Sequence, residues 1–531
     1  MATYRVLVSD PISEKGVDAL RSAPDISVDV KTGLSPEELL TIIGEYHGLV
    51  VRSQTKVTPE VFAAATQLKA IGRAGVGVDN IDRDAATDHG VVVMNTPSGN
   101  TISTAEHAFT LMASLARNIP QAHASVIAGK WERKAFQGVE LFGKRLAILG
   151  MGRIGTEFAK RAQAFGIHVV AYDPFLTAAR AQALKVELAE TPDIALTGAD
   201  LVTLHVPLTP ETKHIINAKR LALLNPGALV VNCARGGLVD EAAAKESLDA
   251  GHLGGIALDV YETEPPAADF PLFSAKKTAF TPHLGASTAE AQENVGIEVA
   301  HQLRDFFVTG EIRNAVNMPN LDSRTLQSAG PYLDLARSLG KLLSKIGPEQ
   351  SDKIRVSYIG PVSEIDTELV TRSVLAGYLS AAYHEAQVNL VNAPAIAKAH
   401  GIQISETSSS LATTFTDLIE VSVVKGGETS TVAGTIIGKS SRIVHIAGHY
   451  VETNPTGHFL FVENDDRPGI VGVIGSALGS AQVNIANMSL SRNAERKTAV
   501  TVIEVDEQPP ASLLELLRTT PGILRVLSFE L

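Results

Sequence analysis

The feature that most constrains the fold of this chain is a glycine pattern at residues 146–155, LAILGMGRIG. Gly150, Gly152 and Gly155 have the spacing G-x-G-x-x-G, after an apolar strand and before a helical stretch, TEFAKRAQAF. In this context the first glycine permits a tight turn, the second lets the backbone approach a pyrophosphate, and the third allows close helix packing. The N-terminus of the helix favours the negative charge. The pattern therefore predicts a dinucleotide site, and a tight turn without a ligand is the alternative.

An acidic residue indicates which dinucleotide binds. Asp173 ends the next predicted strand, 18 residues after Gly155. A carboxylate there is placed to bind both hydroxyls of a ribose, and it would repel a 2′-phosphate. Pro174 and Phe175 follow it, where an arginine would favour NADP. The sequence predicts NAD as the cofactor and predicts no metal site.

Short apolar strands alternate with helical stretches through about the first 315 residues. Their Val, Ile and Leu residues run continuously, as in GLVVRS (48–53), which is typical of parallel strands covered on both faces. We expect an α/β fold with two doubly wound Rossmann-like domains. The substrate-binding domain covers residues 1–98 and is completed by a returning helix within residues 289–315, and the NAD-binding domain covers residues 99–288.

Two further units are predicted after this region. Residues 316–454 combine a helix, YLDLARSLGKLLSKI, with strands such as KIRVSYIG, and predict an α+β intervening domain without a catalytic cluster. Residues 455–531 show the order βαββαβ of a ferredoxin-like module. A compact terminal module of this kind suggests ligand sensing or pairing between subunits.

Composition limits the possible partners. The 531 residues carry 46 Lys and Arg against 58 Asp and Glu, a formal net charge of -12. This balance argues against a binder of nucleic acid or anionic membranes, but it allows a local basic pocket. The sequence contains no run of about 18 apolar residues, so it predicts no membrane span. The single cysteine, Cys233, excludes an internal disulfide framework and fits a reducing, cytoplasmic location.

Four polar residues, Arg235, Asp259, Glu264 and His283, follow predicted strands after the glycine pattern. Taken singly, each fits a structural role, such as a surface arginine in a turn. In an open α/β sheet, ligands bind beyond the carboxyl ends of the strands, so these residues gather at one edge. Oxidation of a 2-hydroxy acid needs an arginine for the carboxylate, a histidine for the hydroxyl proton and a glutamate that orients the histidine. The glycines after Arg235 would keep the loop bare for the substrate.

Several stretches resemble motifs of the D-isomer-specific 2-hydroxyacid dehydrogenase family, namely GMGRIG, NCARGGLVDE, LDVYETEPP and TPHLGAST. Three others, GRAGVGVDNID (72–82), NTPSGNTISTAEH (95–107) and GKWERKAF (129–136), are similar to the long-form branch that acts on 3-phosphoglycerate and carries a C-terminal ACT domain. The resemblance implies NAD-dependent oxidation of 3-phospho-D-glycerate to 3-phosphooxypyruvate, the first committed step of L-serine biosynthesis. It also implies feedback regulation by L-serine and a homodimer or homotetramer.

The resemblance further implies roles for individual residues. Arg235 orients the substrate, His283 is the acid/base and Glu264 is the partner of the histidine. The implied cofactor contacts are Gly150, Gly152, Arg153, Ile154, Gly155, Asp173, Val206, Cys233 through its backbone, Ala234, Asp259, His283 and Gly285. The implied substrate contacts are Arg52, which supplies charge for the phosphate, Ser53, Gly75, Asn100 and Thr101, with Arg133 and Lys134 reaching a neighbouring subunit's site. The implied effector contacts in the ACT-type module are Asn464, Asp466 and Asn484, for which turn capping is the alternative.

Two other functions stay open from the sequence. One is a different 2-hydroxyacid dehydrogenase or reductase, acting on glyoxylate, hydroxypyruvate or 2-oxoglutarate; Arg52 and the two C-terminal units argue against it, although a secondary activity on 2-oxoglutarate would use the same site. The other is an NAD-sensing corepressor of the same fold. Corepressors lack a terminal ACT module, which this sequence contains.

Overall fold

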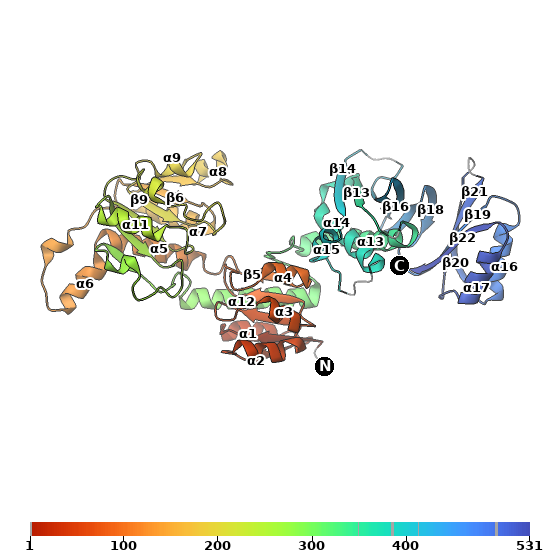
Figure 1. Cartoon of the computed structure of the whole chain (residues 1–531), viewed down its shortest axis with the longest axis horizontal. Helices are drawn as coiled ribbons and strands as arrows, with labels where there is room; N and C mark the ends of the chain where they lie inside the picture. Colours follow the sequence, from red (N-terminus) through yellow and green to blue (C-terminus); the bar gives the residue numbers. More distant parts are fainter. Residues whose placement is uncertain (1–2, 349, 384–386, 412–413, 494–496) are drawn as a thin grey trace.

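The computed structural model describes residues 3–348, 350–383, 387–411, 414–493 and 497–531. These residues form four sheets, one in each predicted unit. In Figure 1 the first sheet lies between the second sheet and the third, and the fourth is at the far end of the molecule. The predicted fold class is confirmed: two parallel α/β units are followed by an α+β unit and a ferredoxin-like module.

The first sheet is parallel, with the strand order β2-β1-β3-β4-β5. Its strands are β1 (Tyr4–Val8), β2 (Ile26–Val30), β3 (Gly48–Val51), β4 (Ala70–Arg73) and β5 (Val92–Asn95), joined by α1 (Glu14–Arg21), α2 (Pro36–Ile42), α3 (Pro59–Ala64) and α4 (Arg83–Asp88). The late helix α12 (Ala289–Thr309) returns to this unit and packs Val295, Val299 and Leu303 into its core. The crossing of α12 with α1 is close, because a Cβ on Gly16 would lie 2.5 Å from the carbonyl oxygen of Gly296.

The second sheet is also parallel, and its strand order reverses beside β6. The order is β12 (Thr278–Phe280), β11 (Leu253–Leu258), β10 (Ala228–Asn232), β9 (Leu201–Leu204), β6 (Arg145–Leu149), β7 (His168–Tyr172) and β8 (Glu187–Leu188). Its helices are α5 (Thr101–Ala116), α6 (Ile119–Ile127), α7 (Arg153–Ala164), α8 (Ala178–Ala183), α9 (Pro192–Leu196), α10 (Ala218–Leu221) and α11 (Glu241–Asp249). Two apolar cores cover its two faces, which explains why its strands are continuously apolar.

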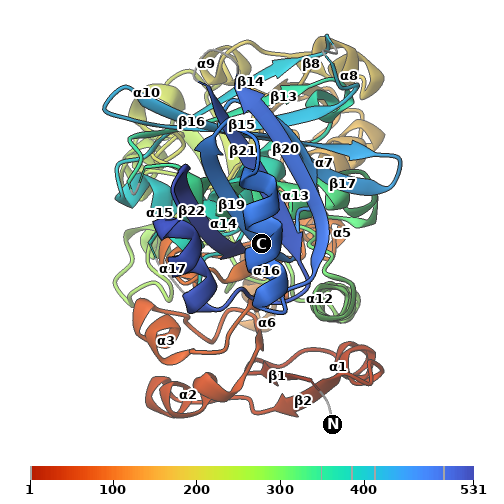
Figure 2. The same ribbon diagram turned by 90° about the vertical axis from the view of Figure 1, so that its right-hand side faces the viewer.

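The third sheet is mixed and the fourth is antiparallel. The third has the order β14 (Gln403–Ser409), β13 (Lys353–Ile359), β15 (Leu418–Lys425), β16 (Glu428–Ile437), β17 (Ser440–Ile446) and β18 (His449–Thr453), packed with α13 (Ser323–Ile346), α14 (Thr367–Ala382) and α15 (Ala393–Ala399). The fourth has the order β20 (Ile485–Asn493), β21 (Thr498–Val505), β19 (His458–Asp465) and β22 (Ile523–Glu530), with α16 (Ile470–Ser480) and α17 (Ala511–Thr519). Figure 2 shows these two helices over one face of the fourth sheet.

Buried side chains connect the units. Phe459, Phe461 and Phe529 of the fourth sheet belong to the same buried cluster as Leu335 of α13. Leu369 of the third unit likewise packs into the core of the first sheet. The limits of the four predicted domains stay predictions. Within the described residues, no helix is both long and apolar enough to cross a membrane.

Candidate active site

A cavity of about 250 Å³ opens beyond the carboxyl ends of β6, β9, β10, β11 and β12, where the strand order of the second sheet reverses. Ligands of open α/β sheets bind at this kind of position. Among the predicted site residues, Asn100, Ile154, Val206, Cys233, Ala234, Arg235, Asp259, His283 and Gly285 line the cavity. Val76, Thr104, His205, Pro207 and Ala286 also line it, without having been predicted.

The glycine turn has the geometry that a pyrophosphate needs. Gly150 has a φ of 98°, and a Cβ there would lie 2.4 Å from the carbonyl oxygen of His205. A Cβ on Gly155 would lie 2.0 Å from the carbonyl oxygen of Gly150, so α7 packs closely on the turn. A Cβ on Gly152 would meet nothing within 4 Å, and no side chain caps α7 at this position. The open space and the uncapped helix N-terminus fit the negatively charged part of NAD.

Asp173 organises the same turn. Its Oδ2 accepts a hydrogen bond from the backbone N–H of Met151 at 2.8 Å, and its Oδ1 accepts one from Phe175 at 2.8 Å. A carboxylate has about four acceptor positions, so two are left for the hydroxyls of a ribose. Asp173 therefore holds the glycine loop and can also bind the cofactor.

Asp259 anchors the loop that carries His283. Its Oδ1 accepts hydrogen bonds from Thr281 (2.6 Å) and Leu284 (2.7 Å), and its Oδ2 accepts one from Gly285 (2.8 Å). Burial opposes the charge of this carboxyl, but the hydrogen bonds from His107, Thr281 and Leu284 outweigh burial and lower its pKa. Asp259 is therefore a buried carboxylate, and its Oδ2 has an acceptor position for an amide of the cofactor.

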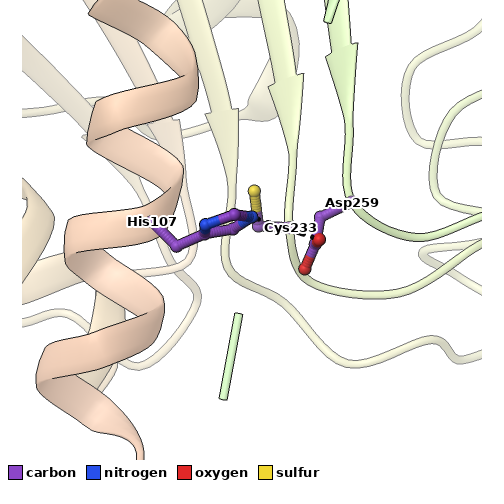
Figure 3. Close-up of side chains that lie close together, drawn as sticks. All are labelled: His107, Cys233 and Asp259. Carbon is purple, nitrogen blue, oxygen red and sulfur yellow. Dashed lines mark hydrogen bonds and ion pairs between the residues drawn. The ribbon is translucent and has the colours of Figure 1, made fainter. Parts of the chain in front are cut away.

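His107, Cys233 and Asp259 lie close together (Figure 3), with candidate ligand atoms within 4.8 Å of one another. The protonation of these side chains argues against an ion in the cluster. Nε2 of His107 lies 3.1 Å from Oδ1 of Asp259, so it carries a proton and offers no lone pair to a metal. Burial and the charge of Asp259 raise the pKa of the Cys233 thiol, which keeps the sulfur protonated.

His283 and Glu264 form an oriented pair. Nδ1 of His283 lies 2.8 Å from Oε2 of Glu264, and the backbone N–H of Tyr261 donates to Oε1 of the same carboxylate at 3.1 Å. The carboxylate thus assigns the imidazole proton to Nδ1, which leaves the lone pair of Nε2 for a proton from a substrate. The side chain of His283 is 54% exposed, so a proton can pass on to solvent.

Arg235 projects from the loop after β10. Its Nη1 donates to the carbonyl oxygen of Ala234 at 2.7 Å, and its Nε lies 3.2 Å from Oδ2 of Asp79. A Cβ on Gly236 would lie 1.8 Å from the carbonyl oxygen of Tyr261, and Gly237 has a φ of 80°. Gly236 and Gly237 therefore serve packing and backbone geometry, and the predicted substrate access stays a prediction.

The predicted substrate residues of the first sheet follow its strands at the carboxyl edge. Asp10 accepts the backbone N–H groups of Arg52 (2.6 Å), Gln54 (3.2 Å) and Thr55 (3.1 Å), which fixes the loop that carries Arg52 and the exposed Ser53. The sequence analysis did not predict this role of Asp10.

Asn100 and Thr101 begin α5, between the two sheets. The side-chain oxygen of Asn100 is buried and has no hydrogen-bond partner among the described residues, so it is available to a ligand in the cavity. The hydroxyl of Thr101 donates to the carbonyl oxygen of Pro97 at 3.4 Å. Of this pair, Asn100 lines the cavity.

The structure does not bring Arg133 and Lys134 to the site of their own chain. Both are exposed on a short helix (Arg133–Phe136) that follows α6. Figure 1 shows α6 extending away from the second sheet, on the side opposite to the first sheet. Any contact of these residues with a substrate would therefore be in another subunit.

The three predicted effector residues do not gather within one chain. Asn464 pairs with Ala499 at one end of β21, whereas Asn484 precedes Ile485, which pairs with Val505 at the other end. Six residues of a strand separate the two ends by about 20 Å. The edge strand β20 is not free either, because Asn487 donates to the carbonyl oxygen of Glu452 in β18 and Ser489 accepts a hydrogen bond from the N–H group of Glu452. The three residues therefore do not form one site within a single chain, and the expected serine site between paired modules stays a prediction.

Asp466 and Asn464 differ in their contacts. Oδ2 of Asp466 accepts hydrogen bonds from Arg492, at 2.8 Å from Nε and 2.7 Å from Nη2. The side chain of Asn464 is buried, and its oxygen has no partner among the described residues. Asn484, in turn, donates to Asp506 at 2.6 Å.

Three basic or imidazole side chains at or near the site were also missed by the sequence interpretation: Arg73, His107 and His205. His107 and Arg73 lie within stretches that carried the family resemblance, yet neither position has a local pattern that assigns a role. His205 directly follows β9 and is fully buried, and burial lowers its pKa to about 3. Its position after a strand of the second sheet was the available signal.

Three family models match consecutive parts of the chain. They describe the NAD-binding domain of D-isomer specific 2-hydroxyacid dehydrogenases over residues 109–285, the D-3-phosphoglycerate dehydrogenase intervening domain over residues 328–447, and an ACT domain over residues 458–522. The matches agree in order with the second, third and fourth units of the structure.

Solved structures match about three fifths of the chain. The TT0316 protein from Thermus thermophilus is 35% identical and aligns with a TM-score of 0.54, over 59% of this chain and 99% of its own. A glyoxylate reductase from Paecilomyes thermophila is 30% identical with a TM-score of 0.55, over 60% of this chain and 99% of its own.

Two curated relatives match along the whole length. The D-3-phosphoglycerate dehydrogenase of Archaeoglobus fulgidus is 42% identical over 529 residues, which cover 99% of this chain and 100% of the relative. The D-3-phosphoglycerate dehydrogenase of Bacillus subtilis is 41% identical over 533 residues, with the same coverage. Identity of this extent, together with the ordered family matches, confirms the resemblance found in the motifs. The chain belongs to the D-3-phosphoglycerate dehydrogenase family.

Proposed function

We propose that this NAD-dependent oxidoreductase converts 3-phospho-D-glycerate to 3-phosphooxypyruvate, the first committed step of L-serine biosynthesis. The observation that carries the proposal is His283, which is paired to Glu264 and lines the same cavity as Arg235. The cavity adjoins an open glycine turn that fits NAD. The names of the full-length relatives support the phosphorylated substrate.

Each residue of the cavity has a different role in the proposed reaction. Arg235 binds the substrate carboxylate with its two-pronged guanidinium and holds C2 near His283. His283 takes the proton of the C2 hydroxyl at Nε2, while Glu264 stabilises the imidazolium that forms. NAD, when bound, accepts the hydride that leaves C2. The alcohol thus loses one hydride and one proton and becomes a ketone, and His283 releases the proton to solvent.

The cofactor would be held by residues of the second unit. The N–H groups at the start of α7 and the glycine turn would bind the pyrophosphate, and Asp173 would bind the ribose. Asp259 and the backbone of Cys233 lie where the nicotinamide would enter the cavity. These contacts are proposals that rest on the fit of the residues to the group.

A reductase for an unphosphorylated acid is the second candidate, because a glyoxylate reductase is 30% identical to part of the chain. That alignment covers 60% of the chain, whereas the D-3-phosphoglycerate dehydrogenases extend through the intervening and ACT units. The whole-length match favours the phosphorylated substrate.

The proposal is tested by following NADH formation from 3-phosphoglycerate and NAD with the purified full chain. We expect turnover with NAD that exceeds turnover with NADP, and slower reduction of glyoxylate, hydroxypyruvate and 2-oxoglutarate with NADH. If glyoxylate is reduced with a higher kcat/KM than 3-phosphooxypyruvate, the second candidate replaces the first.

We also propose a homodimer or homotetramer that works in the cytoplasm. The arm of α6 and the following loop exposes several large apolar side chains, among them Ile127 (74%), Trp131 (78%) and Phe142 (77%), which would be covered by a second subunit. Pairing through this arm would carry Arg133 and Lys134 toward the partner. A single buried free cysteine suits a reducing compartment.

The proposed effector is L-serine, bound between paired ACT modules. A two-fold axis would bring the Asn464 end of one sheet beside the Asn484 end of its partner, and so unite residues that lie about 20 Å apart in one chain. The carboxylate of Asp466 suits an ammonium group, and the amides of Asn464 and Asn484 suit a carboxylate and a hydroxyl. The pairing would use the ends of the sheet, because β18 lies beside the middle of β20.

A further inference from the structure

Arg73, at the end of β4, is an arginine with too few partners. Its Nε is buried and has no hydrogen-bond partner among the described residues. Its Nη1 makes a long contact with the carbonyl oxygen of Ala74, at 3.5 Å. No carboxylate of the described residues lies within 4.0 Å of its guanidinium. A buried N–H of a guanidinium without a partner is costly, which points to a ligand that completes the site.

The loop after β4 is shaped around this guanidinium. Gly75 has a φ of 144°, and a Cβ there would lie 1.5 Å from Nη1 of Arg73. A Cβ on Gly77 would lie 2.1 Å from Nη2 of Arg235. Two glycines of one loop therefore make room for two guanidinium groups. Gly75 is predicted to contact the substrate directly, and it also makes room for the guanidinium group of Arg73.

Positive charge accumulates at this point between the two sheets. Burial, together with the charges of Arg235 and Arg52, lowers the pKa of Arg73 to about 10. The nearby carboxylates do not balance these three arginines. Asp10 is occupied by backbone N–H groups, and Asp79 is 77% exposed and pairs with Arg235. The site is suited to a ligand with more than one negative charge.

The strands decide which end of the substrate meets Arg73. Arg235 and His283 follow strands of the second sheet, where the carboxylate and C2 of the substrate are placed. Arg52 follows β3 and Arg73 ends the neighbouring strand β4 of the first sheet, where Val51 is paired with Arg73. The phosphate, at the opposite end of the substrate from the carboxylate, would therefore face these two arginines.

We propose that Arg73 binds the phosphate of the substrate together with Arg52 and so sets the preference for phosphorylated over unphosphorylated 2-oxo and 2-hydroxy acids. This inference rests on the proposed function for the identity of the substrate. It assigns a specificity residue that no motif indicated.

The test compares Arg73→Met and Arg73→Lys with the wild type in the direction of reduction, using 3-phosphooxypyruvate and hydroxypyruvate with NADH. Arg73→Met should raise KM for 3-phosphooxypyruvate at least about tenfold, because a charge-assisted fork is lost. It should change kcat/KM for hydroxypyruvate by less than about threefold. Arg73→Lys, which keeps the charge without the fork, should fall between the two. The matched control is Arg83→Met, an exposed arginine of α4 in the same unit, which should leave both substrates unchanged.

Equal losses with both substrates, or an unchanged KM for 3-phosphooxypyruvate, would overturn the inference. A second measurement separates this outcome from failure of the proposed function. Inorganic phosphate should raise the melting temperature of the NADH-bound wild type and should have less effect on Arg73→Met. If the wild type does not reduce 3-phosphooxypyruvate but phosphate still protects it through Arg73, the proposed function fails and the anion site stands. Equal protection of wild type and variant by phosphate would refute the anion site.

Discussion

At the scale of single residues, the backbone of His283 is strained and its neighbours hold it. Its φ of 56° lies in the left-handed region, which costs a residue with a side chain about 1 kcal/mol or more. The N–H group of His283 donates to the carbonyl oxygen of Asp259 at 2.9 Å, and the next two N–H groups donate to the Asp259 carboxylate. The buried charge of Asp259 thus keeps the imidazole beside Glu264.

The pair of His283 and Glu264 predicts two different losses of activity. His283→Ala should lower kcat about a hundredfold or more, because the acid/base group is removed. Glu264→Gln should lower kcat less, by about tenfold, since the amide can still orient the ring but cannot stabilise its charge. Steady-state kinetics give kcat, and NADH fluorescence checks that both variants bind the cofactor. Near-normal turnover of His283→Ala would show that another group takes the proton.

His205 predicts how stability depends on pH. Its folded pKa of about 3 lies below the unfolded value of about 6.5, so below pH 6.5 the unfolded chain binds a proton that the folded chain does not. The free energy of unfolding should therefore decrease as the pH falls, by about 2 kcal/mol between pH 6.5 and 5. Urea unfolding at both pH values should show this decrease in the wild type and a smaller one in His205→Gln. Identical decreases would mean that His205 does not titrate this way.

At the scale of elements, β6, α7 and β7 form a unit that local sequence predicts well. The turn needs Gly150 for its positive φ and Gly155 for the close approach of α7, so the glycine pattern predicts the geometry of the turn. Asp173 at the end of β7 reaches back to Met151 in the same turn. All these contacts lie within a single βαβ unit, which is why the sequence alone could predict them.

Asp173→Asn should weaken the preference for NAD over NADP by at least about tenfold. The amide keeps an oxygen for a backbone N–H group, so the turn stays folded, but the charge that repels a 2′-phosphate is lost. The ratio of kcat/KM values for the two cofactors measures the effect. Asp249→Asn, an exposed acid on α11 of the same unit, should leave the ratio unchanged. A ratio that is also unchanged in Asp173→Asn would place the discrimination elsewhere.

Other parts of the site depend on contacts between elements that are distant in sequence. Arg73 is singled out by its buried, unpaired Nε and by glycines of the following loop, and no local sequence pattern predicts an unpaired atom. The reason for Gly236 is the backbone of Tyr261, 25 residues later. The separation of Asn464 from Asn484 follows from the strand order and register of the fourth sheet. The succession βαββαβ alone does not predict which residues are paired. These features needed the structure.

At the scale of the whole molecule, the ACT module is not an independent attachment. Phe459, Phe461 and Phe529 are buried in one cluster with Leu335 and Tyr358 of the intervening unit. Deleting residues 455–531 would expose that apolar surface and risk aggregation. A test of regulation by truncation would therefore confuse loss of the effector with damage to the neighbouring unit, and single substitutions at the module surface are the cleaner choice.

The proposed serine site makes a prediction about mixed oligomers. If Asp466 of one chain and Asn484 of its partner share a site, Asp466→Ala and Asn484→Ala each damage every site of their own homo-oligomers. A pair with one chain of each kind has one site with both residues intact and one with neither. Mixed pairs, isolated through two different tags, should regain about half of the wild-type serine sites at wild-type affinity.

Calorimetry of the three preparations decides between a shared site and a site within one chain. In a site formed by a single chain, mixing would restore nothing, because every site would still carry one substitution. Arg492→Met serves as a control, because it removes the ion pair that Asp466 forms with Arg492 when no ligand is bound. If the loss in Asp466→Ala comes from direct contact with the ammonium group, Arg492→Met should retain binding, since the carboxylate is then released to the ligand. Absence of serine binding by the wild type, or equal weakness of mixed and parent oligomers, contradicts the shared site. Recovery of half the sites would show that two chains together form the regulatory unit of the molecule.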